Sequence, residues 1–527
     1  MNTCASRLLA MAEAYPNDIA TVLNGQRLTY GQLRRRIANA VTTLKSMPLQ
    51  SGQRVGLALA NLNETIVLFY ALNAMGISVV LLHPLSSGKL LRQRLDEVDC
   101  TIVFVLDLLA SRYGQHLDGC TVIAVEAIHS ATAWQKVFLR FKRTPLPIWR
   151  EANHPDPLDP LIDEPNAVIL FSSGTTGSQK AIGLSNAAMN ALVDQMETCV
   201  APQRGVDGIL AVLPFFHGFG LGIWMHTVLA LGGKCILVPR LHKNTLISTL
   251  LTQKPSYLAA VPYLLRVLLA SKAFMRADLS FIKQVFVGGE TVPLPLIRAF
   301  NAALRKGGSS ACVQVGYGTT ETLTAVTLMP KSDSEKPGVG VPLPGNTLAI
   351  LNANGQLAAP LHAGEILVSG PTLMNGYLNL GDLNATTLIT LEGQRWVNTH
   401  DIGMIDEHGI VHFHHRSDDL LNVKGYLINP HDLEDALYRI DGVREVNALL
   451  DDDGRLVVVM SVQPALSRKA LKQKTAQICT DLDGWMKPHR LVVLSSLPKN
   501  EMRKLDRRQT LTAITARSNG FRWEWFP

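Results

Sequence analysis

Several features common in other protein classes are missing from this 527-residue chain. Its seven cysteines are scattered and odd in number and form no C-x-x-C pair, which argues against disulfides and a cysteine-bound zinc and predicts a reducing, cytoplasmic compartment. The N-terminus lacks the basic-then-apolar plan of a signal peptide. The most apolar stretch, 66–82, is interrupted by Asn73 and Gly76. It is therefore predicted to form a core helix and strand rather than a membrane span.

Nucleic-acid binding is also disfavoured, because no dense Lys/Arg run with interleaved aromatic residues occurs. The net charge of +7 is a modest excess for this length, and it suits an acidic partner or a polyphosphate ligand. With 47% hydrophobic and 18% charged residues, the chain can bury a large core, and its length allows two to four domains. No internal repeat is found.

One loop, 171–180, organises the chain. The apolar run 167–170 in front of it is predicted to be a short buried strand. The loop contains glycines and small hydroxyl residues and closes with Lys180, a combination that suits phosphate binding by backbone N–H groups, hydroxyls and a point charge. A flexible linker is the alternative, but it explains neither the strand nor the lysine. The P-loop pattern does not fit, because Gln179 stands where glycine is required and Ala181 follows the lysine.

Helix and strand patterns alternate along much of the chain, which predicts an α/β fold with parallel strands. Three more candidate segments, 214–220, 287–290 and 316–321, follow predicted strands, and open α/β sheets bind ligands at carboxyl ends of strands. From about 338 to 417, short alternating runs with glycine and proline predict a β-rich subdomain. Residues 418–527 are predicted to form a small α+β domain after the N-terminal domain, 1–417.

Local signals predict the first elements. The pair Asn24-Gly25 lies between two apolar runs and indicates a hairpin. Thr29 is predicted to cap a helix over 30–44.

Taken together, the loop, the run 317–321 and the 400–425 region resemble the acyl-adenylate-forming enzymes. These are acyl- and aryl-CoA synthetases, adenylation domains of peptide synthetases and beetle luciferase. The resemblance spans nearly the whole chain, with motifs in the family's order. It implies a large N-terminal domain of layered α/β subdomains with a β-rich subdomain, and a small mobile α+β C-terminal domain. The smaller domain would turn about a hinge at Asp418.

The resemblance also implies roles for particular residues. Those resembling the loop that holds the β,γ-phosphates of ATP are Ser172, Ser173, Gly174, Thr175, Thr176, Gly177 and Lys180. Those resembling the adenine slot and adjoining ATP contacts are Gly288, Gly289, Glu290, Tyr317, Gly318 and Thr319. Asp401 resembles the carboxylate that grips the ribose hydroxyls, and Arg416 a second ribose or phosphate contact. Thr320 resembles a phosphate contact and Glu321 the magnesium ligand, in keeping with the few carboxylates that magnesium takes.

Lys504 resembles the mobile catalytic lysine, which would stabilise charge as a substrate carboxylate attacks the α-phosphate. Residues around the expected thiol channel are Lys424, Gly425 and Tyr426. Residues expected at the acyl pocket are Phe216, Phe219 and Gly316, with His217, counted among the catalytic residues, as its gate.

Plainer roles compete with these. Lys504 lies in a charged stretch, which usually means a solvated face, although the preceding 497–499, Leu-Pro-Lys at family spacing, favours catalysis. Tyr317 could be core and Asp401 a turn residue, and the choice between a gate and a satisfied core histidine stays open for His217. His412, His414 and His415 do not indicate a metal site, because no carboxylate or cysteine completes a ligand set.

The chain departs from the family pattern at four positions, Gln179, Asn186, His400 and Arg503. In the family, proline is usual at position 179, histidine at 186, and glycine at both 400 and 503. A bulky side chain at 400 or 503 flanks a residue with a proposed chemical role and is expected to affect rate more than reaction type.

The predicted reaction has two steps: activation of a carboxylic acid by ATP and Mg²⁺, with release of pyrophosphate, and transfer of the acyl group to the phosphopantetheine thiol of CoA. Phe215–Phe216 offers no acid to pair an α-ammonium, so a fatty or aryl acid is favoured over an amino acid. The alternatives are a stand-alone ligase that loads an acyl or peptidyl carrier protein and a catalytically weakened acyl-adenylate binder.

Overall fold

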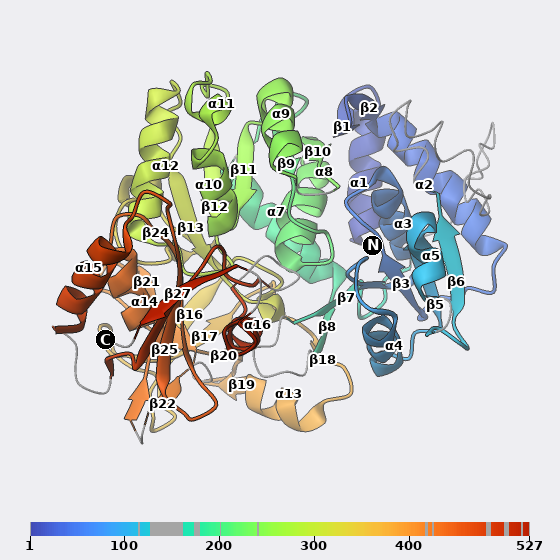
Figure 1. Cartoon of the computed structure of the whole chain (residues 1–527). Coiled ribbons are helices and arrows are strands. Elements are labelled where there is room, and N and C mark those ends of the chain that lie inside the picture. The colour runs from blue at the N-terminus through green and yellow to red at the C-terminus, as the bar shows by residue number, and fades with distance from the viewer. Residues whose placement is uncertain are drawn as a thin grey trace.

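A computed structural model of the chain (Figure 1) describes residues 2–113, 116–126, 162–172, 180–200, 202–239, 242–416, 420–423, 426–480, 486–499, 505–517 and 520–525. It contains two large mixed sheets, a smaller antiparallel sheet and a separate C-terminal sheet. The N-terminal elements (blue) and the C-terminal elements (orange to red) lie at opposite sides of the view, with residues of intermediate number between them.

The first large sheet has nine strands, and its central strands are parallel. In spatial order they are β15 (Val341–Pro342), β14 (Thr327–Leu328), β13 (Val313–Tyr317), β12 (Gln284–Val287), β11 (Tyr257–Ala260), β9 (Gly208–Ala211), β10 (Lys234–Leu237), β1 (Ile19–Leu23) and β2 (Gln26–Thr29). The run from β13 to β1 is parallel throughout. The carboxyl ends of β9, β12 and β13 therefore meet at one edge.

The second large sheet has seven strands and carries the glycine-rich loop. Its order is β18 (Gly376–Tyr377), β8 (Ala181–Leu184), β7 (Val168–Phe171), β4 (Ser78–Leu81), β3 (Arg54–Ala58), β5 (Ile102–Leu106) and β6 (Thr121–Val125). Strands β7, β4, β3, β5 and β6 are parallel, while β8 and β18 are added antiparallel at one edge. The loop connects β7 to β8.

Two further β regions follow. The antiparallel sheet consists of β16 (Thr347–Leu351), β17 (Gly364–Ser369), β20 (Gln394–Ile405), β19 (Leu388–Leu391) and β21 (Val411–Arg416). The C-terminal part, residues 420–525, contains the hairpin β22 (Leu421–Val423) and β23 (Tyr426–Ile428), and a sheet of β24 (Val443–Leu450), β25 (Leu456–Val462), β26 (Arg490–Leu494) and β27 (Phe521–Trp525). Two buried clusters, around Leu433 and Val459, give this part its own core.

Helices cover the sheets. Those before the antiparallel sheet are α1 (Cys4–Ala14), α2 (Tyr30–Lys45), α3 (Asn63–Ala74), α4 (Gly88–Glu97), α5 (Asp107–Tyr113), α7 (Asn186–Val200), η2 (Phe219–Thr227), α8 (Val228–Ala230), α9 (Lys243–Gln253), α10 (Pro262–Leu269), α11 (Lys272–Met275), α12 (Leu294–Lys306), η3 (Thr320–Thr322) and η4 (Lys331–Asp333). Later ones are α13 (Gly381–Thr387), α14 (Pro430–Tyr438), α15 (Arg468–Thr480) and α16 (Arg507–Thr515). No helix among the described residues is long and apolar enough to cross a membrane.

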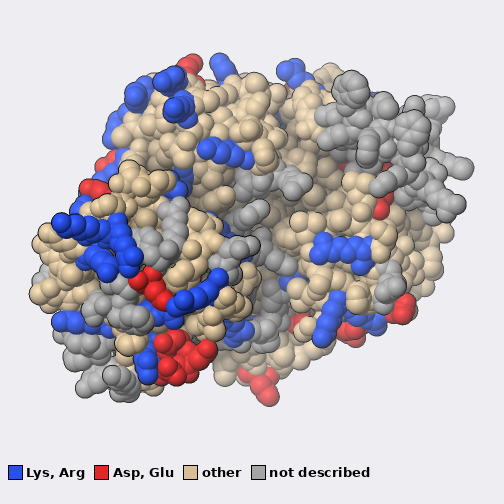
Figure 2. Space-filling model, viewed as in Figure 1, with Lys and Arg blue, Asp and Glu red and all other residues tan. Residues whose placement is uncertain are grey.

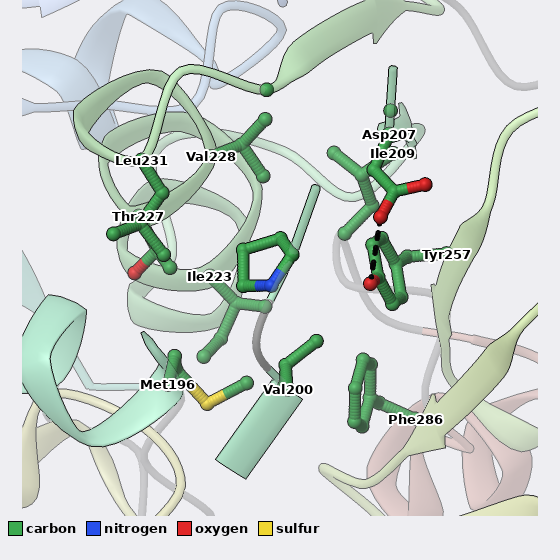
Figure 3. A pocket seen from close by; sticks show the side chains of 13 residues that line it. Met196, Val200, Asp207, Ile209, Ile223, Thr227, Val228, Leu231, Tyr257 and Phe286 are labelled. Atoms are coloured by element: carbon green, nitrogen blue, oxygen red, sulfur yellow. Dashed lines mark hydrogen bonds between the residues drawn. The ribbon is translucent and has the colours of Figure 1, made fainter. Parts of the chain in front are cut away.

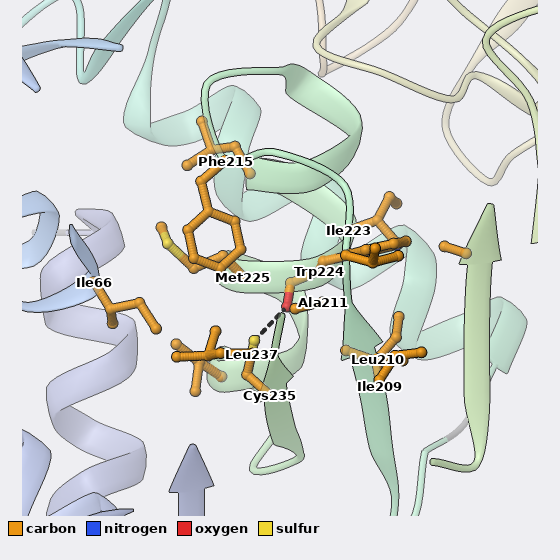
Figure 4. Close-up of a cluster of buried hydrophobic side chains, with 14 of the residues drawn as sticks. Ile66, Ile209, Leu210, Ala211, Phe215, Ile223, Trp224, Met225, Cys235 and Leu237 are labelled. Atoms are coloured by element: carbon orange, nitrogen blue, oxygen red, sulfur yellow. Dashed lines mark hydrogen bonds between the residues drawn. The ribbon is translucent and has the colours of Figure 1, made fainter. Parts of the chain in front are cut away.

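One helix is unusual, because η2 has the wide turn of a π-helix over nine residues. Such helices are rare overall, and where they occur they often lie at functional sites. It is almost entirely buried, and Figure 4 shows Cys235 of β10 packed beneath it, with its Sγ 3.2 Å from the carbonyl oxygen of Trp224. Phe215 and Met225 fill the side toward Ile66 of α3. This helix is thus fixed between β10 of the nine-stranded sheet and helix α3.

The predicted fold class, α/β with a large N-terminal domain and a smaller C-terminal part, is confirmed. The apolar stretch 66–82 divides into helix α3 and strand β4, as expected. Thr29 caps α2 in a capping box with Gln32, which satisfies donors at the helix start. The boundary at 418 falls outside the described residues and stays a prediction.

Candidate active site

Two of the predicted segments meet where β12 and β13 end side by side. A Cβ at Gly288 would lie 2.7 Å from the carbonyl oxygen of Gly316, and Gly289 has a left-handed φ of 82°. The neighbouring backbone thus explains these glycines directly, since larger residues would force the strand ends apart. Glu290 follows in the same turn.

Two site loops are packed backbone to backbone. A Cβ at Gly318 would overlap the carbonyl oxygen of Thr324, and one at Gly218 would overlap that of Leu323. Leu323 itself has a positive φ of 67°, which is a strained conformation for a non-glycine residue. Thr319 begins the short η3 turn, where its N–H donates to the Thr322 hydroxyl over 3.1 Å. Strain and close approach of this kind concentrate at functional sites.

The loop after β9 presents a stack of rings. The Phe216 ring lies 4.7 Å from that of His217 and 4.7 Å from that of His83, which follows β4 of the other large sheet. Phe219 begins η2, and its ring centroid is 6.3 Å from that of Trp224. The predicted acyl-pocket residues Phe216 and Phe219 therefore stand at the entrance to the π-helix, with His217 between them in the chain.

The two large sheets are joined by Tyr377 of β18. Its hydroxyl donates to Glu321 Oε1 over 2.8 Å, and Lys180 Nζ lies 5.2 Å from its ring centroid. Tyr377 is buried, and burial together with Glu321 raises the pKa of its phenol, so it remains a hydrogen-bond donor. Lys180 is predicted to bind phosphate and Glu321 to bind magnesium. Both residues thus contact the side chain of Tyr377.

The start of that loop is well defined. The N–H of Ser172 donates to the Lys180 carbonyl over 3.0 Å, and the N–H of Lys180 donates to Ser172 Oγ over 3.1 Å. These bonds continue the antiparallel β7–β8 pairing by one residue. They hold Lys180 at the mouth of the loop.

A third cluster lies where the antiparallel sheet meets β13. Tyr317 donates to Asp401 Oδ2 over 2.6 Å, and Arg416 Nε lies 3.5 Å from Asp401 Oδ1. Asp401 and Arg416 are directly opposed on β20 and β21. Burial, then the neighbouring Asp401, raises the pKa of Tyr317, which therefore stays protonated. The rings of Tyr317 and Phe413 lie 6.1 Å apart. Three predicted nucleotide contacts are therefore brought together.

The departures from the family pattern have local explanations where they are described. His400 has a left-handed φ of 55°, its N–H donates to Asn398 Oδ1 over 2.9 Å, and its Nδ1 is 3.4 Å from Glu365 Oε1. His400 thus contacts Asn398 and Glu365, whereas the neighbouring Asp401 contacts Tyr317 and Arg416. Asn186 is buried, and its Oδ1 accepts from the N–H of Cys4 over 2.9 Å, so it ties the N-terminal helix into the core.

Some predictions cannot be placed. Those outside the described residues are Ser173, Gly174, Thr175, Thr176, Gly177, Asp418, Lys424, Gly425 and Lys504, together with the departures Gln179 and Arg503. Tyr426 is described only as the first residue of β23. Their roles stay predictions.

The donor set fits magnesium that is shared with a ligand. Among the described ranges, no group of three His, Cys, Asp or Glu could hold a metal by itself. Glu321 instead offers a single carboxylate beside the hydroxyl of Thr320 and the charge of Lys180. Magnesium commonly uses one or two carboxylates and completes its shell with phosphate oxygens and water.

Sequence reasoning missed two contributors. Tyr377 bridges Glu321 and Lys180, but it belongs to a two-residue strand with no periodic signal. The wide turns of η2 were also missed, because its nearly uniform apolar sequence hides the helix type. The Gly-rich start, Phe219-Gly220-Leu221-Gly222, was the available hint, since these glycines allow close packing.

Comparison with known proteins defines the class. Residues 8–378 match the family of AMP-binding enzymes, and the chain belongs to that family. It is 27% identical to a long-chain-fatty-acid–CoA ligase of Bacillus subtilis, across 97% of this chain and 95% of that protein. It is 26% identical to 4-coumarate–CoA ligase 2 of Oryza sativa subsp. japonica, across 97% and 92%.

Solved structures share the fold. An anthranilate CoA ligase in complex with anthranoyl-AMP superposes with a TM-score of 0.82 at 20% identity, over 98% of both chains. The O-succinylbenzoate coenzyme A synthetase of Bacillus subtilis, in complex with ATP and magnesium, gives 0.77 at 22% identity, over 96% of this chain and 98% of that one. The resemblance to acyl-adenylate-forming enzymes is thereby confirmed, and the chain is an adenylating ligase of the acyl- and aryl-CoA ligase type.

Proposed function

We propose that this protein activates a fatty or aryl carboxylic acid with ATP and transfers the acyl group to the thiol of CoA. The observation that carries the proposal is the convergence of Lys180 and Glu321 on Tyr377, close to the Gly316–Glu321 segment that also supplies Tyr317 to Asp401. Cationic, carboxylate and hydroxyl groups attached to three sheets are thus linked by these contacts, and the triphosphate and ribose of ATP are proposed to lie beside them. The names of the full-length relatives support the same activity.

The residues would act by positioning and by balancing charge. Lys180 and the glycine-rich loop would hold the β,γ-phosphates, and Asp401 would accept hydrogen bonds from ribose hydroxyls. Glu321 would hold Mg²⁺, which supplies charge neutralisation at the phosphates. Lys504 would stabilise the charge that develops when a carboxylate oxygen of the acid bonds to the α-phosphorus and the bond to pyrophosphate breaks. In the second step the thiolate attacks the acyl carbon, and AMP leaves with the electron pair.

An apolar pocket supports an acid with an apolar tail. It lies between α7, η2 and strands β9, β11 and β12 (Figure 3), and its walls include Met196, Val200, Ile223 and Phe286. Phe286 lies two residues before Gly288, whereas Gly208 and Tyr257 begin β9 and β11, so the pocket extends along the sheet toward the amino ends of these strands. We propose that it receives the tail of the acid.

The acidic member of the pocket wall is already paired. Asp207 lies 2.6 Å from Lys283 Nζ and accepts from the Tyr257 hydroxyl over 3.1 Å. Burial opposes its ionisation, but Lys283 and the hydrogen bonds keep the pKa of Asp207 below its usual range. A cationic group on the tail of an acid would therefore have to displace Lys283, which favours an uncharged tail.

The acceptor is proposed to be CoA, with a carrier protein as the second candidate. Lys and Arg side chains on the face in Figure 2 form separate groups over the C-terminal part and the upper helices. An anionic partner of either kind suits such a surface. The relatives' names favour CoA.

The test is acid-dependent pyrophosphate release from ATP and Mg²⁺, with hydroxylamine trapping the activated acyl group. The panel contains decanoic, hexadecanoic, benzoic and 4-coumaric acids, with leucine as the amino-acid control. We expect release with at least one fatty or aryl acid and none with leucine. CoA and a phosphopantetheinylated carrier protein are then offered to the active acid, and the product mass identifies the acceptor.

Ile223→Trp tests the tail pocket. It should shift the preference toward shorter acids while leaving activation of the shortest accepted acid within about twofold. A uniform loss for all acids would place the tail elsewhere.

A further inference from the structure

Helix α10 contacts the C-terminal part through two cation–π pairs. In one pair α10 supplies the ring, and in the other it supplies the cation. Lys499 Nζ of the C-terminal part lies 4.1 Å from the ring centroid of Tyr263, and the Arg266 guanidinium carbon lies 5.5 Å from the ring centroid of Tyr438. Tyr263 and Arg266 are three residues apart on α10, so they share one face of the helix. The opposite face, with Leu264, Leu265 and Leu268, is buried in the N-terminal core.

Lys499 is held firmly on its own side. Its Nζ lies 2.5 Å from Glu445 Oε1, and Glu445 Oε2 accepts from the N–H of Leu497 over 3.1 Å and from Ser461 Oγ over 3.0 Å. Burial opposes ionisation of Glu445, but Lys499 and these hydrogen bonds keep the pKa of its carboxyl below the usual range. The Lys499 side chain that meets Tyr263 is therefore fixed in direction by Glu445.

Tyr438 is fixed to the same strand. Its hydroxyl accepts from the N–H of Val446 over 3.1 Å, one residue after Glu445 on β24. Both C-terminal partners of α10 are thus anchored to consecutive residues of one strand. They form a single surface attached to the C-terminal sheet.

The position of α10 connects these contacts to the proposed site. The helix starts at Pro262, directly after β11, which lies between β9 and β12 in the sheet whose strand ends carry the site loops. Lys499 is five residues before Lys504, and an extended chain of that length spans at most about 18 Å. Seating Lys499 on Tyr263 therefore limits where the proposed catalytic lysine can lie.

We propose that Tyr263 and Arg266 form a seat that holds the C-terminal part in the orientation for acid activation, and that they are positioning residues for acyl-adenylate formation but not for thiol transfer. This inference rests on the proposed function. Each contact requires its cation over the partner ring within about 6 Å, so both form only when the C-terminal part is held against this face of α10.

The experiment separates the two half-reactions in the full-length protein. Variants Tyr263→Ala, Tyr263→Phe and Arg266→Ala are compared, with Val267→Ala, on the same helix but packed against the N-terminal core, as the matched control. The first half-reaction is pyrophosphate release with the active acid of the panel and hydroxylamine. The second is CoA-dependent consumption of the corresponding synthetic acyl-adenylate.

We expect Tyr263→Ala and Arg266→Ala to slow the first half-reaction by about tenfold, as loss of one cation–π pair allows, and to leave the second within about twofold. Tyr263→Phe keeps the ring and should behave as wild type. Hydrogen–deuterium exchange gives a readout independent of activity: Tyr263→Ala should raise exchange in 486–499 without changing β11.

The proposal that Tyr263 and Arg266 position the C-terminal part would be overturned by equal slowing of both half-reactions or by no slowing. It would also be overturned if Tyr263→Phe were as impaired as Tyr263→Ala. Failure of the proposed function looks different, because the wild type would then release no pyrophosphate with any acid. In that case an activation role for the seat fails too, and the exchange data decide whether the contacts hold the C-terminal part on α10.

Discussion

Replacing Tyr377 with phenylalanine should raise the magnesium requirement of the enzyme. The substitution removes the hydroxyl that donates to Glu321 Oε1 over 2.8 Å and keeps the ring beneath Lys180. A hydrogen bond to a charged group contributes about 1.5–3 kcal/mol. If roughly half of this serves to hold Glu321 in its binding orientation, the half-saturating Mg²⁺ concentration rises about tenfold. The rate at saturating Mg²⁺ should change far less.

Two measurements check this: pyrophosphate release as a function of Mg²⁺, and calorimetric titration of the protein with ATP at high and low Mg²⁺. Tyr377→Ala also removes the cation–π contact and should weaken ATP binding about threefold further. Tyr113→Phe is the control, because its buried hydroxyl donates to the Pro84 carbonyl instead. A Tyr377→Phe variant with an unchanged or lower magnesium requirement would refute the reasoning, since Tyr377 would then compete with the metal for the carboxylate.

Substitutions at three further positions test packing and pH dependence. Gly218→Ala should reduce the yield of folded protein or cost more than about 3 kcal/mol, because its methyl group meets the backbone of Leu323 rather than a movable side chain; thermal melting checks this, and a wild-type melting temperature would contradict it. Burial lowers the pKa of His226 to about 3, so the unfolded chain binds a proton below pH 6.5 that the folded protein excludes. Urea denaturation should show stability falling by about 1.4 kcal/mol per pH unit between pH 6.5 and 5, and His226→Gln should lose that slope. His400→Gly should stay within about 1 kcal/mol and twofold activity of wild type, because relief of the left-handed backbone offsets the lost contact with Glu365, whereas His400→Val should be at least about 2 kcal/mol less stable.

Most of the fold was predictable because its signals are local. The segment 287–290 is predicted to follow a strand, and β12 ends at Val287, where a short apolar run meets two glycines. The helix predicted over 30–44 is α2, which ends one residue later, at Lys45. The meeting of two separate sheets at the site was not predictable, because the pairing of β18 with β8 joins segments almost two hundred residues apart and leaves no periodic trace.

The proximity of some candidate site residues was predictable as well. Glu321, Asp401 and Lys180 stand out by residue type within recognisable motifs, and the structure brings each beside another predicted residue or a shared partner. Tyr377 was missed because a lone tyrosine in a two-residue strand is indistinguishable from a core residue. The contact of Lys499 with Tyr263 depends on how two units pack, which no local pattern encodes.

The most direct test of acid activation compares acid-dependent pyrophosphate release by the wild type and by Lys504→Ala, with ATP binding measured on both proteins. The account predicts release by the wild type with a fatty or aryl acid, a fall of at least about a hundredfold in the variant, and similar ATP affinity in both. ATP binding without acid-dependent release across the whole panel, or equal release by the variant, would contradict it.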